Sequence, residues 1–256
     1  MQPDLDLARR FLALHPPVGT VAMCGITGSH QYGFPSVDSD LDLKGIHVAP
    51  TEALLGLTRP TDAHDRLEVF EGTECDLTTH EIGRALSLLL KGNGNVLERL
   101  ASPYQLVASD VLTELRAWMP DLLSRRCHGH YAGYLQGMRR EHARDGRVKS
   151  LLYAYRVALT GIHVLRTGEV EANLPVLART YGVDGLDALI ERKRSAERGT
   201  LDPGEEVSHL LVLDRLGAEL DAARDSSPLP EHPGLAPELD GWLVELRRAH
   251  LVSAME

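Results

Sequence analysis

Two aspartates that stand two residues apart, Asp40 and Asp42, form the strongest chemical feature of the sequence. They alternate with Leu41 and Leu43, which is the period of a β-strand whose alternate side chains share one face. Two ionised carboxylates on one face repel each other unless a cation lies between them. Oxygen ligands of this kind suit Mg²⁺ or Mn²⁺. The pair therefore predicts a divalent-metal site.

A Gly-Ser pair, Gly28 and Ser29, precedes the aspartates by a spacer rich in Gly, Ser, Pro and Asp. The apolar segment 18–26 before it is typical of a buried strand. If a helix begins at Gly28, its free backbone N–H groups and the Ser29 hydroxyl point at an anion, and glycine lets the backbone approach a phosphate. An isolated Asp-x-Asp often only caps a turn. Beside Gly-Ser and two apolar strands, it indicates a site for a metal-chelated triphosphate.

A third carboxylate is expected from a neighbouring strand. The segment ECDLTTH offers Glu74 and Asp76, which have the same strand parity. Either acid could complete a two-metal site and take the proton of an attacking hydroxyl. The residues alone leave both candidates open.

A second stripe of polar residues lies in the helical segment KSLLYAYRVALTGIH. Lys149, Tyr153 and Arg156 are spaced i, i+4 and i+7, so they share one helix face. A cationic stripe at the edge of a buried face could reach into a cleft. The alternative is a solvated helix edge with ion pairs.

Three further groups of residues have less specific interpretations. Asn95 and Glu98 could cap a helix and pair with an arginine, or touch a substrate. The segment 139–149 is rich in arginine and could hold a polynucleotide backbone or form a salt-bridged helix face. His128 and His130 could ligate a metal, but no third ligand is evident nearby, so we expect a surface role for both.

The elements that must position these residues change character along the chain. The first part alternates strand and helix patterns, and the part after residue 105 shows helical spacing with few strand signals. This order predicts an α+β protein with a catalytic domain at 1–104, a helical domain at 105–225, and a Pro-rich linker with a last helix at 226–256. In detail we expect helices at 4–14, 80–91 and 238–251, strands at 18–26 and 41–49, and a hairpin over 67–79 that turns at 71–72.

Composition narrows the classes of function. Of 256 residues 43% are hydrophobic and 25% charged, and no apolar run is long enough to span a membrane. The N-terminus lacks the pattern of a secretory signal, and the three cysteines Cys24, Cys75 and Cys127 form no CxxC pair, so we expect a cytoplasmic protein. A net charge of −10 argues against a broad basic surface for duplex nucleic acid. A nucleic-acid partner would need a local basic patch.

The motif GSHQYGFPSVDSDLDLKGI resembles the signature of nucleotidyltransferases in the DNA polymerase beta superfamily. Its extended form is most similar to the RNA-repair-associated (RNA-ligase-associated) polymerase-beta-like bacterial family, through Tyr32-Gly33 and the segment 39–45. The later GNGNVLERL is similar to that family's GNPN-like turn, with Gly94 in place of proline. The resemblance covers roughly residues 20–165.

The resemblance implies a mixed sheet flanked by helices, with the helical domain completing an NTP cleft. It implies transfer of a nucleoside monophosphate from an NTP to an acceptor hydroxyl, with an RNA 3′ end in RNA repair as the expected acceptor. The third acid carries over best to Asp76, and phosphate ligands carry over to Lys149 and Arg156. Transfer to a protein or a small molecule, such as a toxin target or an antibiotic, is the alternative that the acidic charge favours. An inactive nucleotide-binding or partner-binding module is an alternative of another class.

Overall fold

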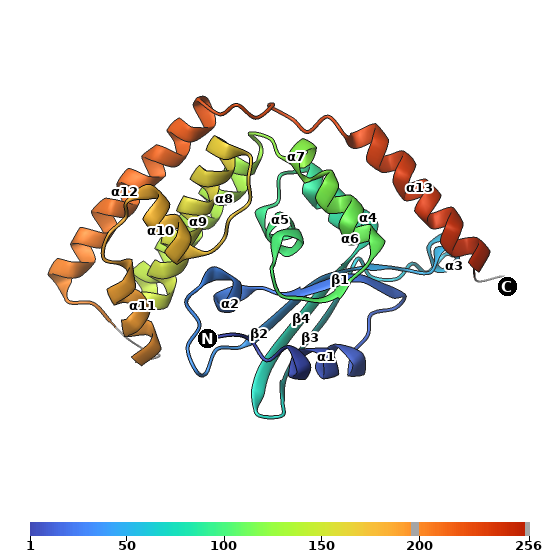
Figure 1. Cartoon of the computed structure of the whole chain (residues 1–256), viewed down its shortest axis with the longest axis horizontal. Helices are drawn as coiled ribbons and strands as arrows, with labels where there is room; N and C mark the ends of the chain where they lie inside the picture. The colour runs from blue at the N-terminus through green and yellow to red at the C-terminus, as the bar shows by residue number, and fades with distance from the viewer. Residues whose placement is uncertain (196–199, 254–256) are drawn as a thin grey trace.

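A computed structural model describes residues 1–195 and 200–253 of the chain. Its core is a five-stranded mixed sheet in the order β3-β4-β2-β1-β5 (Figure 1). The strands β2 and β4 run parallel, and the other neighbours are antiparallel. The strands are β1 (Thr20–Ile26), β2 (Leu41–Val48), β3 (Ala63–Phe70), β4 (Thr73–Glu81) and β5 (Gln105–Ala108).

The hairpin between β3 and β4 turns at Glu71 and Gly72, as the sequence predicts. Both residues have positive φ, 49° and 86°. Positive φ at both central residues is the geometry of a turn whose twist matches that of the two strands. The hairpin is the outer edge of the sheet, and β4 joins it to the central strand β2.

Helices cover both faces of the sheet. On one face, α1 (Leu5–Leu14) places Phe11 against a cluster that includes Leu43 and Leu77. On the other face, α4 (Ile82–Leu90) and α5 (Gly94–Ala101) pack on residues such as Ile46. A short helix, α2 (Gly28–Tyr32), follows β1 directly. The alternation of inward-facing residues along β2 therefore puts Asp42 on the same face as α4, α5 and α2.

The helical half of the protein is built around α9 (Val148–Thr167), most of whose residues are buried. The neighbours of α9 are helices that pack around it, and Figure 1 shows them beside the sheet. They are α8 (Cys127–Asp145), α10 (Leu174–Tyr181), α11 (Leu186–Ser195) and α12 (Pro203–Asp225). Two helices, α6 (Asp110–Ala117) and α7 (Met119–Leu122), connect the sheet to this half.

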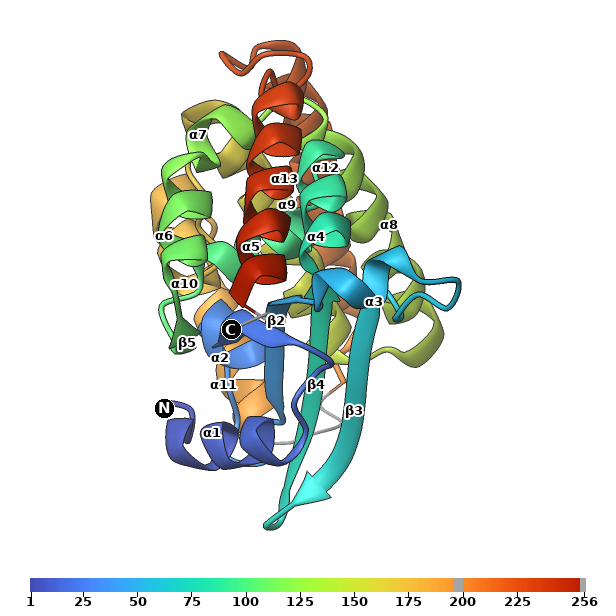
Figure 2. The ribbon, with the colours of Figure 1, turned by 90° about the vertical axis from the view of Figure 1, so that its right-hand side faces the viewer.

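The last helix, α13 (Ala236–Ser253), returns to the sheet half. It contacts α3 (Thr51–Leu55) and α4, and Figure 2 shows it alongside α4. Arg247 on α13 pairs with Glu81 at the end of β4, and its carbonyl accepts a hydrogen bond from Thr51. The end of the chain is therefore part of the packing of its first third.

The predicted fold class, an α+β mixed sheet flanked by helices and followed by a helical region, is confirmed. One strand departs from the prediction, because residues 105–108 form β5 and pair with β1. A boundary after residue 104 would therefore separate a strand from its sheet. Within the described residues, no helix is both long enough and apolar enough to cross a membrane.

Candidate active site

The end of β1 and the start of β2 are tied together at the centre of the site. Thr27 N–H donates to the carbonyl of Asp42 over 2.8 Å. Gly28 then begins α2 with a φ of +61°, which only glycine adopts at little cost. The tie brings the Gly-Ser segment against the strand that carries the aspartates.

A first cavity, which we call the charged cavity, lies between this loop and the helical half. It has a volume of about 90 Å³. Ser29, Asp40 and Asp42 line it from the sheet half, as the spacing predicts. Its full lining is Ser29, Ser36, Asp38, Ser39, Asp40, Asp42, Lys149, Tyr153 and Lys193.

A second cavity, which we call the tyrosine cavity, adjoins the first and shares Asp42 and Tyr153 with it. Its volume is about 270 Å³. Three tyrosines from three helices line it together with polar residues of β2 and α5. Its full lining is Thr27, Gly28, Tyr32, Asp42, Lys44, Asn95, Glu98, Arg99, Tyr134 and Tyr153.

The candidate third acid, Asp76, lies directly beside Asp42 in the parallel pair of β2 and β4. Its carboxylate forms an ion pair with Lys44, with 2.7 Å between Nζ of Lys44 and Oδ2 of Asp76. Lys44 also donates to the Thr78 hydroxyl over 3.2 Å. Glu74, the other candidate, is exposed and lines neither cavity. The geometry favours Asp76, although Asp76 borders the cavities through Lys44 and does not line them.

The aspartate carboxylates are oxygen ligands of the kind that a hard cation prefers. Burial raises the pKa of Asp42 to about 6, and the negative charges of Asp76 and Asp40 add to this effect, while Lys44 opposes it. A cation at Asp40 and Asp42 would relieve the repulsion between them. Among the described residues, no three His, Cys, Asp or Glu side chains gather as a ready metal cluster. Two of the three predicted ligands therefore share a cavity, and the third is held by a lysine.

Of the three residues in the predicted stripe on α9, two line the cavities and one does not. Lys149 is exposed and lines the charged cavity, and Tyr153 lines both cavities. Arg156 is fully buried and lines neither. Its Nη1 pairs with Glu98 over 2.7 Å, and its guanidinium lies 4.0 Å from the centre of the Tyr32 ring. Arg156 lies one helical turn after Tyr153 and is buried against Glu98 of α5. Its predicted role as a phosphate ligand therefore does not fit its position.

The Arg156–Glu98 pair matches the expectation that Glu98 would bond an arginine. Glu98 also accepts a hydrogen bond from the Tyr32 hydroxyl over 3.1 Å. The pair therefore joins α9 of the helical half to α5 and α2 of the sheet half. Asn95, one turn earlier on α5, faces the tyrosine cavity.

The expected surface role of His128 and His130 does not fit their partly buried positions, whereas some of the arginines have partners within the protein. Arg139 pairs with Asp214, and His128 pairs with Asp221 over 2.7 Å, in both cases joining α8 to α12. His130 packs against the ring of Tyr131. Neither histidine belongs to a group of three potential metal ligands among the described residues.

Lys193, near the end of α11, is a site residue that the sequence did not reveal. Only 8% of its surface is exposed, and its Nζ donates to the Phe34 carbonyl over 3.0 Å and to the Ser36 hydroxyl over 3.1 Å. Arg194 adds a bond to the Pro35 carbonyl. Burial, with a smaller effect of Lys149, lowers the pKa of Lys193 to about 8. The segment ERKRS looks like a solvated helix face, so only the fold reveals the contact.

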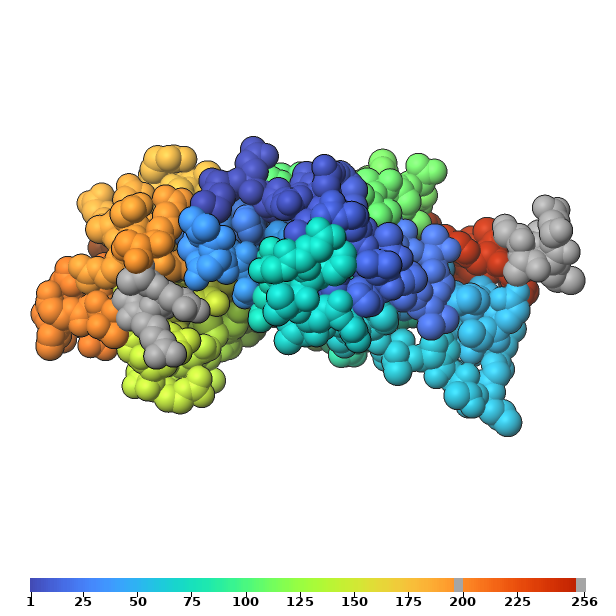
Figure 3. Space-filling model, turned by 90° about the horizontal axis from the view of Figure 1, so that it is seen from below, coloured from blue at the N-terminus to red at the C-terminus, as the bar shows by residue number. Residues whose placement is uncertain are grey.

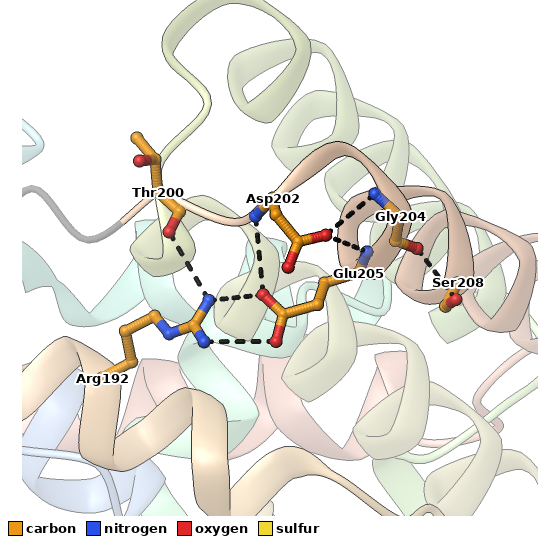
Figure 4. Close-up of polar contacts among 6 residues, drawn as sticks. All are labelled: Arg192, Thr200, Asp202, Gly204, Glu205 and Ser208. Carbon is orange, nitrogen blue, oxygen red and sulfur yellow. Dashed lines mark hydrogen bonds and ion pairs between the residues drawn. The ribbon is translucent and has the colours of Figure 1, made fainter.

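The position of α11 is fixed from its other side. Arg192 makes two bonds to the carboxylate of Glu205, of 2.7 Å and 3.2 Å (Figure 4). Glu205 belongs to a capping box with Asp202 that begins α12. Seen from below, α11 (orange) lies next to the lighter blue atoms of the loop before β2 (Figure 3). The helix therefore connects α12 to the loop that precedes Asp40.

Comparisons with known proteins identify the family of the chain. A family model described as RlaP, the RNA repair pathway DNA polymerase beta family, matches residues 9–245. The uncharacterized protein MJ0002 of Methanocaldococcus jannaschii is 24% identical over 81% of this chain and 86% of its own length. The uncharacterized protein YcgL of Bacillus subtilis is 26% identical over 78% of this chain and 79% of its own.

A solved structure of a nucleotidyltransferase-like protein from Exiguobacterium sibiricum is also similar. It is 11% identical, with a TM-score of 0.35, and the match covers 88% of this chain and 75% of that one. The family expected from the Gly-Ser and Asp-x-Asp motifs is confirmed by the family match.

Proposed function

Because the chain belongs to the RNA repair pathway DNA polymerase beta family, we propose that it is a metal-dependent nucleotidyltransferase. It transfers a nucleoside monophosphate from an NTP to an acceptor hydroxyl, which we propose to be an RNA 3′ end. The observation that carries the proposal is the charged cavity. There Ser29, Asp40 and Asp42 of the sheet half and Lys149 of the helical half line one space, and their charges suit phosphates together with a divalent cation.

The chain's own residues have separate tasks in this proposal. Ser29 and the adjoining N–H groups of α2 bind phosphate oxygens, and Lys149 approaches the same phosphates from the helical half. Asp76 accepts the proton of the acceptor hydroxyl at its carboxylate. The acceptor oxygen forms a bond to the α-phosphorus, and the bond from the α-phosphorus to pyrophosphate breaks. Lys44 holds the Asp76 carboxylate on the same sheet face as Asp42.

Asp40 and Asp42 are the residues that would hold Mg²⁺ or Mn²⁺, with Asp76 as a further ligand. When bound, such an ion neutralises charge on the transferring phosphate and orients it. The raised pKa of Asp42 supports this assignment, because its carboxylate lies in a place that disfavours its own negative charge.

The family description supports RNA as the acceptor. The alternative acceptor is a protein or a small molecule, and the net charge of −10 favours it. The basic segment at the end of α8 keeps Arg140 and Arg144 exposed, and they could contact a polynucleotide backbone.

The test is a transfer assay. The protein is incubated with each labelled NTP in turn and with Mg²⁺ or Mn²⁺. Separate reactions contain total RNA, a deproteinised small-molecule extract, or purified cellular protein as the acceptor. We expect metal-dependent label on RNA, and no label with Asp42→Asn. Label on protein or on a small molecule would identify a different acceptor and leave the proposed transfer reaction unchanged. No metal-dependent transfer or nucleotide binding in any arm would contradict the proposal.

A further inference from the structure

The two cavities that meet at Asp42 and Tyr153 differ in the kind of ligand they can take. We infer that the tyrosine cavity binds the nucleoside of the NTP while the charged cavity binds its phosphates, an inference that rests on the proposed function. The two cavities together then span one nucleotide, with the α-phosphate beside the shared residue Asp42.

Apart from Asp42, which both cavities share, the charged groups of the tyrosine cavity have protein partners. Glu98 pairs with Arg156, and Lys44 pairs with Asp76. Arg99 is buried and bonds the His80 ring. In the charged cavity, by contrast, neither Lys149 nor Asp40 has an ion-pair partner among the described residues. Free charge is therefore concentrated where phosphates and a cation would lie, and the tyrosine cavity suits a neutral, aromatic group.

The walls of the tyrosine cavity have the chemistry of a base-binding site. Tyr153 is held edge-on by Tyr32 and Phe34, with ring centres 5.8 Å and 5.4 Å away. Tyr134 contributes a second, half-buried ring. Aromatic faces of this kind stack on nucleobases whatever their sequence. The Asn95 amide has no hydrogen-bond partner among the described residues, and it offers both a donor and an acceptor to a base edge.

This placement leaves one direction for the acceptor. The nucleoside and the pyrophosphate lie in the two cavities, and Asp76 lines neither of them. Asp76 is on β4, beside Asp42 in the parallel strand pair, with 41% of its side chain exposed. An acceptor hydroxyl that reaches Asp76 therefore approaches the α-phosphate without entering either cavity.

The experiment compares two probes on the full-length protein in the presence of Mg²⁺. Calorimetry measures the affinity for an NTP, which would occupy both cavities, and for inorganic tripolyphosphate, which would occupy the charged cavity alone. Tyr134→Ala is the test variant because Tyr134 is half-buried, and Tyr134→Phe keeps the ring and removes only the hydroxyl. Lys149→Ala is the control for the charged cavity.

We expect Tyr134→Ala to weaken NTP binding by about tenfold or more, the usual effect of losing one base–aromatic stack, with tripolyphosphate binding unchanged. Tyr134→Phe should bind NTP within about twofold of the original protein, since the stacking ring remains. Lys149→Ala should weaken both probes alike.

Equal losses for NTP and tripolyphosphate in Tyr134→Ala, or no loss for either, would overturn the inference and leave the proposed function intact. Such a result, together with a raised KM for the acceptor alone, would assign the tyrosine cavity to the acceptor. If the original protein bound neither probe, the proposed function would fail and this inference with it.

Discussion

A methyl group placed on Gly28 would lie 1.8 Å from the Oδ2 atom of Asp42. The absence of a side chain at Gly28 thus makes room for the carboxylate of Asp42 on β2. The Gly-Ser motif and the Asp-x-Asp motif are in direct contact, and neither can change its shape independently of the other.

Gly28→Ala should therefore abolish Mg²⁺-dependent NTP binding by displacing Asp42. The matched control is Gly146→Ala, because Gly146 has a nearly equal φ of +63° but open space around its α-carbon. Both variants should lose roughly 1–2 kcal/mol of stability from the left-handed backbone. Calorimetry and urea unfolding separate the two effects. NTP binding that survives in Gly28→Ala would show that the contact has no role in the site.

The pKa of Asp42 predicts how stability depends on pH in the absence of metal. The value is about 6 in the folded protein, against an ordinary value of 3.8. Between these pH values the folded state binds more protons than the unfolded state, so this contribution to stability decreases as pH rises and is lost above about 6. Asp42→Asn should thus stabilise the protein at pH 7.5 in EDTA by about 1–2 kcal/mol, after allowance for partial exposure.

Urea unfolding at pH 4 and pH 7.5 checks this result, and the stabilisation should be small at pH 4. A loss of stability in Asp42→Asn at pH 7.5 would mean that the carboxylate is satisfied without a cation. Addition of Mg²⁺ should raise the melting temperature of the original protein and leave that of Asp42→Asn unchanged.

Asp76 should matter mainly to turnover. Asp76→Asn should bind Mg²⁺-NTP nearly as well as the original protein and transfer about 10²- to 10⁴-fold more slowly, because a general base contributes roughly that much. Glu74→Gln is the control on the same strand face and should remain active. Single-turnover transfer and calorimetry measure the two quantities. An inactive Glu74→Gln with an active Asp76→Asn would reverse the assignment.

The buried Arg156–Glu98 pair should be structural. Arg156→Met leaves Glu98 buried without its partner and should cost about 3–5 kcal/mol of unfolding free energy. Combining it with Glu98→Gln should recover part of that loss. Lys149→Met, on the same helix but exposed, should leave stability within about 0.5 kcal/mol. Unchanged stability in Arg156→Met would indicate that the pair contributes little.

Lys193 should act by fixing the loop before Asp40. Lys193→Met keeps the apolar stem and removes the bonds to residues 34–36, so hydrogen exchange should accelerate in segment 34–40 and NTP affinity should fall roughly tenfold, the loss of about one charged hydrogen bond. Arg192→Met removes the contact to α12 on the other side of α11 and should leave that exchange unchanged. Identical exchange profiles for the two variants would show that Lys193 does not hold the loop.

The parts of the site that could be predicted from sequence are those set by local spacing. Asp40 and Asp42 follow the strand period, and Ser29 directly follows an apolar strand, so short-range geometry brings them to one cavity. Helical periodicity assigned Lys149, Tyr153 and Arg156 to one face, but it carries no information on depth. The burial of Arg156 depends on its pairing with Glu98 of α5, which is a tertiary contact.

The parts that could not be predicted depend on long separations along the chain. Lys193 lies 157 residues from Ser36, and no local pattern reports such a pairing. The strand β5 has only four residues, which is too short for an alternation to appear. Tyr134 and Lys44 looked like ordinary helix and strand residues, and only the meeting of the two halves makes them cavity walls.

The return of α13 to the sheet has a consequence for the order in which the protein can fold. The Arg247–Glu81 pair spans 166 residues, so this long segment must be synthesised before the partner of Glu81 exists. Contacts of such long range slow folding, because a large loop must close before they form. During synthesis the surface of α4 that α13 contacts in the folded protein therefore stays uncovered until α13 has emerged from the ribosome, and surfaces exposed in this way favour aggregation.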